Sequence, residues 1–156
     1  MRLHLCAVGR LRSGPERVLV DDYLKRFNKS ARTLGLGPAT EHEVEDKRGG
    51  GMAAEAALLA RAAPVGTRRL VLDERGAQLS SPDFAALLAR WRDQGVADLA
   101  LCIGGADGLD PAFRAEADFA LSFGAMVWPH ILVRVMLAEQ LYRAAGILAG
   151  SPYHRA

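Results

Sequence analysis

The side chains best suited to chemistry lie in the last third of the sequence. His130 and Arg134 are one helical turn apart, and Tyr153, His154 and Arg155 follow one another near the end of the chain. A histidine can gain or lose a proton near neutral pH, an arginine can bind a phosphate or a developing anion, and a tyrosine ring can stack on a nucleobase. A helix-start histidine, a surface arginine and a frayed terminus explain the same residues without a site. Both interpretations stay open on these residues alone.

A glycine-rich stretch precedes these residues. The apolar run VADLALCIG at 96–104 predicts a strand covered on both faces of a sheet, and GGADG at 104–108 follows it directly. Ligands of parallel α/β sheets bind at the carboxyl ends of the strands. A tight turn with positive φ accounts for one glycine but not for Gly104, Gly105 and Gly108 together. A ligand-binding loop and a plain turn both remain possible here.

The segment LSFGAMVWPH at 121–130 fits neither a helix nor a long strand. Gly124 interrupts its apolar side chains, and Pro129 ends the segment. Such a segment must bury its side chains while its backbone N–H and C=O groups find partners, and a bound adenine ring supplies both. We therefore expect a cofactor loop, with a crossover segment packed in the core as the alternative.

Hydrophobic periodicity predicts the elements that position these residues. Strands are expected at residues 2–8, 39–45, 68–76, 96–104 and 117–124. Helices are expected at residues 16–28, 52–62, from the N-cap Ser81 to Gly95, and 131–149. The third strand is expected to end in a turn at Gly76. Strands that alternate with helices indicate an α/β fold, with a mostly parallel sheet and helices on both faces.

Length and composition narrow the class of protein. The 156 residues fit one domain over 1–156, and no apolar run reaches the roughly 20 residues that span a membrane. The net charge of +2 is too small to indicate a nucleic-acid binder by itself. Cys6 and Cys102 stand in apolar runs without zinc spacing, which predicts buried, reduced thiols and no metal site. Reduced thiols and the absence of a signal-peptide pattern indicate a cytoplasmic protein.

Over essentially its whole length the chain resembles the ribosomal RNA large subunit methyltransferase H family, small members of the SPOUT class of knotted methyltransferases. The matching pieces are LHLCAVGRLR at 3–12, LDERG at 72–76, IGGADG at 103–108, LSFGAMVWPHILVRVMLAEQLYRA at 121–144 and PYHR at 152–155. The resemblance implies a homodimeric cytoplasmic enzyme whose C-terminal part forms a trefoil knot. It implies transfer of a methyl group from S-adenosyl-L-methionine to N3 of a pseudouridine in helix 69 of 23S ribosomal RNA, in assembled ribosomes.

Carried over by position, the resemblance also implies the site residues. Contacts with S-adenosyl-L-methionine are expected from Leu72, Gly104, Phe123, Gly124, Ala125, Met126, Val127 and Trp128. Gly105 and Gly108 are expected to shape the turn beside them. Because N3 of pseudouridine must lose a proton before it attacks, the reaction needs a base or a cation that stabilises the anion. The candidates are His130, Arg134, His154 and Arg155, with Tyr153 beside them; no metal ion is needed. The ending SPYHRA departs from many relatives but keeps Tyr153, His154 and Arg155.

Two other classes of function remain to be weighed. A non-catalytic ribosome-binding or assembly protein would keep the surface arginines but would have no use for the apolar loop at 123–128. An oxidoreductase that binds NAD or FAD would carry GxGxxG after its first strand, and this sequence lacks it. The residues favour the methyltransferase over both, and binding of S-adenosyl-L-methionine separates it from them.

Overall fold

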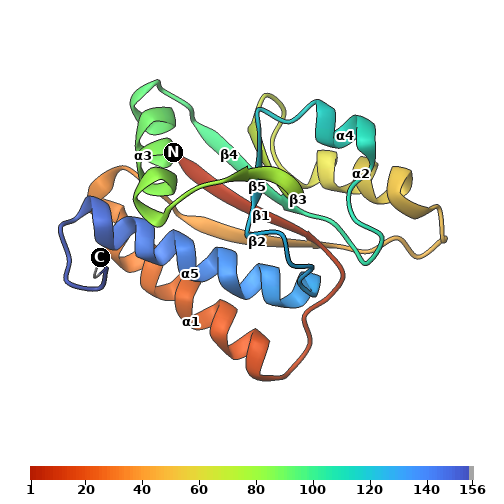
Figure 1. The fold of residues 1–156 in the computed structure, drawn as a ribbon, viewed down its shortest axis with the longest axis horizontal. Helices are drawn as coiled ribbons and strands as arrows, with labels where there is room; N and C mark the ends of the chain where they lie inside the picture. Colours follow the sequence, from red (N-terminus) through yellow and green to blue (C-terminus); the bar gives the residue numbers. More distant parts are fainter. Residues whose placement is uncertain (155–156) are drawn as a thin grey trace.

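The computed structural model describes residues 1–154 and is built around one parallel sheet (Figure 1). Its strand order is β2-β1-β4-β3-β5. The strands are β1 Arg2–Val8, β2 Ala39–Val44, β3 Arg68–Gln78, β4 Asp98–Ile103 and β5 Phe119–Ser122. All four pairings of neighbouring strands are parallel, and β4 is the predicted central strand. The predicted α/β fold is confirmed, and the trefoil knot stays a prediction.

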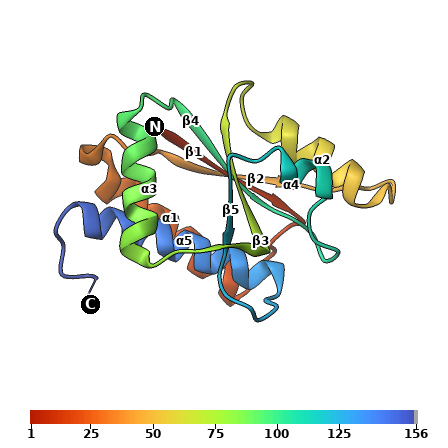
Figure 2. The ribbon, with the colours of Figure 1, turned by 45° about the horizontal axis from the view of Figure 1, so that its top comes forward.

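Helices cover both faces of this sheet (Figures 1 and 2). Three lie on one face, namely α1 Pro15–Ser30, α3 Ser81–Asp93 and α5 His130–Leu148. Two shorter ones lie on the other face, namely α2 Gly51–Ala62 and α4 Pro111–Ala115. A 3-10 turn, Ala31–Leu34, extends α1. None of the helices formed by residues 1–154 combines the length and apolar character that crossing a membrane requires.

Side chains alternate along the strands and divide the core in two. On β4, Leu99 and Leu101 belong to the cluster beneath α1, α3 and α5, whereas Ala100 and Cys102 belong to the cluster beneath α2 and α4. Cys102 is the register partner of Cys6 on β1, and both thiols are buried and free. The prediction of buried, reduced cysteines is therefore confirmed.

Two local predictions are wrong. Ser80, not Ser81, caps α3, because its Oγ accepts the Asp83 N–H at 3.2 Å. Strand β3 does not end in a turn at Gly76 but continues to Gln78. Gly76 lies so close to β5 that a Cβ there would be 2.6 Å from the Ala120 carbonyl oxygen. The absence of a side chain at Gly76 allows the backbones of β3 and β5 to approach each other. A turn prediction from sequence considers only the φ angle of a glycine and not such close approach.

Candidate active site

A cavity of about 280 Å³ opens at the carboxyl ends of β4 and β5, beside the middle of β3, where the pairing of β3 with β4 ends. Three segments form its walls, one after another around the opening. They contribute Leu72, Asp73, Glu74 and Arg75; Ile103 to Leu109; and Leu121, Phe123, Gly124, Met126, Val127, Trp128, His130 and Val133. This edge of a parallel sheet is where α/β proteins bind their ligands.

The first wall is a bulge in β3. Leu72 and Ala77 both pair with Leu121 of β5, so residues 73–76 are left out of the ladder. Bulges redirect side chains and often occur next to functional sites. This one brings Asp73, Glu74 and Arg75 to the cavity, beside the predicted cofactor contact Leu72.

The carboxylate of Asp73 stabilises this bulge. Its side chain is 5% exposed and forms ion pairs with Arg75 Nε at 3.1 Å and Arg114 Nε at 3.2 Å. Burial acts to raise the pKa of Asp73, but the hydrogen bonds from Arg75 and the charge of Arg114 hold the pKa below its usual range. Asp73 is therefore ionised and paired at neutral pH, as suits a structural carboxylate.

The second wall is the loop at 104–108. Gly105 and Gly108 form an isolated bridge, in which the Gly108 N–H donates to the Gly105 carbonyl at 3.1 Å. Of the loop's three glycines, Gly108 alone has a positive φ, 83°. At Gly104 a Cβ would lie 2.8 Å from the Gly108 carbonyl oxygen, and at Gly105 a Cβ would lie 3.0 Å from both carboxylate oxygens of Glu55. The turn thus explains one glycine, and close packing explains the other two.

The third wall is the apolar loop between β5 and α5. Met126 is 72% exposed, Val127 81% and Trp128 40%. Within residues 1–154 the backbone N–H groups of these three residues donate no hydrogen bond to the chain. Phe123 and Gly124 also line the cavity, whereas Ala125 lies in the same loop without lining it. The exposure rules out a segment buried in the core, and apolar surface with free donors is what a cofactor loop requires.

His130 is the first residue of α5 and lines the cavity. Its Nε2 lies 3.7 Å from where a Cβ on Gly9 would be, so the loop after β1 approaches the imidazole. Of the predicted catalytic residues that the structure describes, His130 is the one placed at the cavity.

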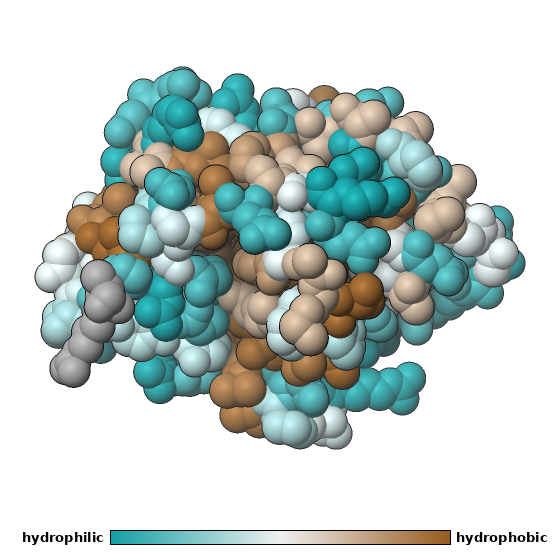
Figure 3. Space-filling model, in the orientation of Figure 1, coloured by the Kyte–Doolittle hydropathy of each residue, from teal (hydrophilic) through white to brown (hydrophobic). Residues whose placement is uncertain are grey.

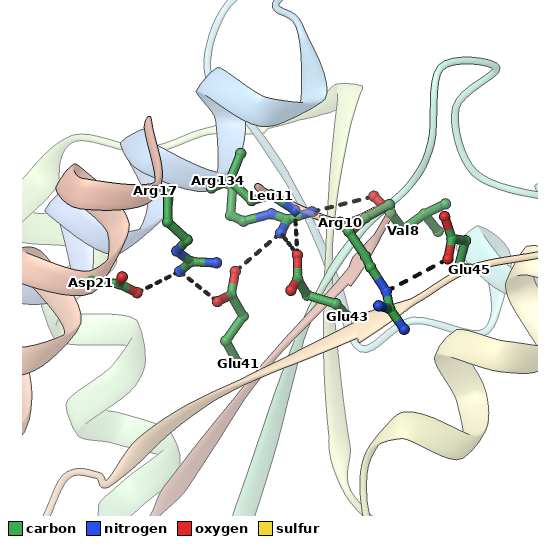
Figure 4. A network of polar contacts seen from close by, with 10 residues as sticks. Val8, Arg10, Leu11, Arg17, Asp21, Glu41, Glu43, Glu45 and Arg134 are labelled. Atoms are coloured by element: carbon green, nitrogen blue, oxygen red, sulfur yellow. Dashed lines mark hydrogen bonds and ion pairs between the residues drawn. The ribbon is translucent and has the colours of Figure 1, made fainter. Parts of the chain in front are cut away.

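The structure places Arg134, predicted to act beside His130, inside the protein and not among the residues that line the cavity. Its side chain is 1% exposed, and Nη1 binds Glu43 at 2.7 Å and Glu41 at 3.1 Å (Figure 4). Nη2 donates to the carbonyls of Gly9 at 2.9 Å and Val8 at 3.3 Å. Arg134 therefore fixes α5 to the ends of β1 and β2, and its charge is used inside the protein.

Tyr153 and His154 lie at the other end of α5 from the cavity (Figures 1 and 2). The 19 residues of this helix separate the two ends by about 28 Å. The Tyr153 ring lies 4.5 Å from the Tyr142 ring between centroids, and its hydroxyl donates to Glu139 at 3.1 Å. Burial, then the charge of Glu139, raises the pKa of Tyr153 far above its usual value. Arg155 lies outside the described residues, and Tyr153 and His154 do not line the cavity that holds His130.

The sequence interpretation missed several charged residues at the cavity, including Asp73, Glu74, Arg75 and Asp107. A usable signal was present for the first three, because they follow directly on the apolar run LVL of a strand. Asp107 stands inside the glycine loop itself. Charged residues that directly follow the apolar run of a parallel strand are therefore candidates for ligand contacts.

Comparison with known proteins agrees with this arrangement. The family model described as "Predicted SPOUT methyltransferase" matches residues 1–154. Proteins of Ruegeria pomeroyi and Roseobacter denitrificans, both named "Ribosomal RNA large subunit methyltransferase H", are 70% and 72% identical over 155 residues, which is 99% of this chain and of each relative. A solved structure of "a probable methylase family protein from Haemophilus influenzae Rd KW20" has a similar fold, with a TM-score of 0.51 at 10% identity over 99% of this chain and 70% of that one. The chain belongs to the SPOUT methyltransferase family.

Proposed function

We propose that this protein transfers a methyl group from S-adenosyl-L-methionine to ribosomal RNA of the large subunit. The observation that carries the proposal is the cavity at the carboxyl ends of β4 and β5 and the bulge of β3, with its glycine loop and apolar loop, in a chain of the SPOUT methyltransferase family. Relatives 70% and 72% identical bear the name of such an enzyme. Because the proposed substrate is the ribosome, we infer that the protein works in the cytoplasm.

The residues of the cavity fit S-adenosyl-L-methionine. Met126 and Trp128 offer exposed apolar surface for an adenine ring, and the free N–H groups of this loop offer hydrogen bonds to its edge. Asp107 and Glu74 add negative charge to the walls, which suits a positively charged sulfonium. When bound, the cofactor would supply a methyl group on that sulfur, and attack of the nucleophile on the methyl carbon would break the carbon–sulfur bond and release S-adenosyl-L-homocysteine. The walls hold the nucleophile in line, and such positioning supplies roughly 7–11 kcal/mol of barrier reduction.

The proposed acceptor is N3 of a pseudouridine in helix 69 of 23S ribosomal RNA, in assembled ribosomes. That nitrogen carries a proton, so a base beside the cavity must take it before or during attack. We assign this role to His130, since it is the histidine of the described residues that lines the cavity, whereas Arg134 is buried in ion pairs.

The proposal includes a homodimer in which the tail of one protomer completes the cavity of its partner. Exposed apolar side chains support it, because they gather over α1 and the start of α5 (Figure 3). Among them are Val18, Leu19, Met126, Val127 and Leu132. Between α1 and α5 this face has a shallow hollow of about 250 Å³. A second copy that covers this face brings its own α5, and the tail at its end, toward the cavity.

A methyl-transfer assay tests the proposed function. Purified protein with methyl-labelled S-adenosyl-L-methionine is offered assembled ribosomes, isolated large subunits or protein-free 23S RNA, and the labelled nucleoside is identified by mass spectrometry. We expect label in 3-methylpseudouridine from assembled ribosomes, strongly reduced in His130→Ala. If the protein binds ribosomes but calorimetry detects no binding of S-adenosyl-L-methionine, it is instead a non-catalytic ribosome-binding protein.

The oligomeric state has its own test. Light scattering at micromolar concentration is expected to give twice the mass of the chain, and Leu19→Glu with Leu132→Glu is expected to shift it to the monomer. A monomeric mass for the unchanged protein would remove the partner's tail from the proposal.

A further inference from the structure

The carboxylate of Glu55, in the second turn of α2, lies against the glycine loop of the cavity. A Cβ on Gly105 would be 3.0 Å from both Glu55 oxygens and 3.2 Å from Val8 Cγ1. The φ of Gly105 is not positive, so the backbone alone permits any residue there. Glycine is required at 105 because the Glu55 carboxylate and Val8 occupy the space that a side chain would fill.

Glu55 is held in this place by the rest of α2. Ala56 and Leu59 on the same helix are buried against the sheet. Just before the helix, Asp46 accepts the N–H of Arg48 at 3.0 Å and of Gly50 at 2.5 Å, which fixes the chain where α2 begins. The backbone that carries Glu55 is therefore packed against the sheet and hydrogen-bonded just before the helix begins.

The charges around Glu55 belong to the cavity. Burial first, and then the negative charges of Asp107 and Asp46, raise the pKa of Glu55, while the Gly105 N–H and the charge of His130 act to lower it. Asp107 and His130 both line the cavity. Glu55 thus interacts electrostatically with two residues that line the cavity, although its own helix, α2, does not line it.

We propose that Glu55 is a positioning residue of the cofactor cavity, whose carboxylate holds Gly105, and with it the loop at 104–108, in the place where that loop can meet S-adenosyl-L-methionine. The inference rests on the proposed function for the identity of the cofactor. By this inference α2, which lies on the face of the sheet opposite α5, also contributes to binding of S-adenosyl-L-methionine. Glu55 would act through contact of its carboxylate with the backbone of Gly105. The effect of removing that contact on cofactor affinity can be measured.

The test measures S-adenosyl-L-methionine affinity by calorimetry and folding by thermal unfolding in each variant. Glu55→Ala is expected to weaken binding about 10-fold or more, as for loss of a charge-assisted contact. Glu55→Gln keeps an oxygen acceptor of the same shape and is expected to stay within about 3-fold of the unchanged protein. Glu116→Ala, which removes a surface carboxylate at the end of α4, is the matched control and leaves affinity unchanged.

A double-mutant cycle with Gly105→Ala separates positioning from general stability. Alone, Gly105→Ala places a methyl group against the carboxylate and is expected to weaken binding about 10-fold. On the Glu55→Ala background the two closest contacts of the methyl group are gone and the loop can move away from Val8, so the same change is expected to cost less than about 3-fold. Equal costs on both backgrounds, or full affinity in a folded Glu55→Ala protein, would overturn the inference. Failure of the unchanged protein to bind S-adenosyl-L-methionine would instead overturn the proposed function.

Discussion

Nη1 of Arg134 lies 2.7 Å from Oε2 of Glu43, and the same oxygen accepts the backbone N–H of Leu11 at 2.5 Å. One carboxylate on β2 thus joins the guanidinium of α5 to the loop that follows β1. The carbonyl of Gly9, in that loop, accepts from Arg134 as well. His130 stands one turn before Arg134 and beside Gly9, so this ion pair holds the backbone on both sides of the imidazole.

Arg134→Met should destabilise the protein strongly. The substitution leaves Glu41 and Glu43 facing an apolar side chain, and removal of one partner of a buried pair costs about 3–5 kcal/mol. Denaturant unfolding at neutral pH measures the loss. Arg90→Met, at an exposed arginine without an ion pair among residues 1–154, is the control and should change stability little. A loss below about 1 kcal/mol at Arg134 would mean that the pair behaves like a surface pair.

The same pair predicts acid sensitivity. Burial acts to raise the pKa of Glu43, but the Leu11 N–H and Arg134 hold it below its usual range. A carboxyl group whose pKa is lower in the folded protein stabilises the fold above its unfolded pKa and loses that effect as the pH falls through the folded value. The stability difference between the unchanged protein and Glu43→Gln should therefore be constant above about pH 5 and shrink below about pH 4. A difference that does not change with pH would contradict this.

Arg134 also shows where sequence reasoning stops. Its spacing from His130 correctly places both on one helix, but spacing does not say that β2 offers two glutamates to the guanidinium. Those glutamates belong to a polar strand more than ninety residues earlier. Contacts of such sequence separation depend on strand order, which periodicity does not determine.

The position of the cavity in the fold was predictable from the sequence, but only some of the residues that form its walls were. The apolar run before GGADG identified β4 and its carboxyl end, because parallel strands buried on both faces carry continuous apolar sequence. The bulge in β3 was not predictable, since Gly76 in sequence indicates a turn and only its contact with Ala120 makes it a strand residue. Gly105 likewise looks like a turn glycine until Glu55 is seen against it.

Trp128 should report cofactor binding directly. Of the two tryptophans, Trp91 is 6% exposed in the core and Trp128 is 40% exposed in the cavity loop. S-adenosyl-L-methionine should cover the Trp128 indole and shift its fluorescence toward shorter wavelength, whereas Trp91 should give a constant background. Titration of the unchanged protein and of Trp128→Phe measures this. An equal response from both proteins would place the cofactor away from the loop.

Deletion of residues 152–156 should leave folding and S-adenosyl-L-methionine affinity intact while ribosome methylation is lost. The reason is distance, since the Tyr153 hydroxyl binds Glu139, nine residues after His130 and therefore about 14 Å from it along α5. If the tail serves a partner's cavity, activity should return when the truncated chain is co-purified with a full-length Gly104→Val chain.

In that mixture each homodimer lacks one essential part. Gly104→Val should close the cavity, because even a Cβ at 104 lies 2.8 Å from a carbonyl oxygen. Random pairing makes half of the dimers mixed, each with one complete site, so about a quarter of the normal activity is expected. A mixture that stays inactive would show that each tail acts within its own chain, and an active truncated homodimer would show that the tail is dispensable.

Basic residues on the cavity edge should bind RNA phosphates. Arg12 follows β1, and Lys47 and Arg48 follow β2; all three are exposed and form no ion pair within residues 1–154. Replacing all three with alanine should weaken ribosome binding and make the dependence of log K on log salt shallower by about 2 to 3, since each phosphate contact contributes roughly 0.9. S-adenosyl-L-methionine affinity should not change.

Three other exposed arginines give a control of equal charge. Arg32, Arg61 and Arg90 lie in the last turns of their helices, at the opposite edge of the sheet. Their triple alanine variant should keep the salt dependence of the unchanged protein. The same shallower slope in both variants would mean that net charge, and not this edge, governs binding.

The bulge of β3 has hydrogen-bonded strand on both sides of it. Leu72 before it and Gln78 after it are both paired with β5, so the wall that carries Asp73, Glu74 and Arg75 is clamped at each end. The loop at 126–128 has no such clamp within the described chain. One side of the cavity is thus preorganised and the other is adaptable, and the conformational entropy lost on binding a ligand falls on the adaptable side. Affinity for the cofactor can therefore be tuned by stiffening that loop, without any new contact to the ligand.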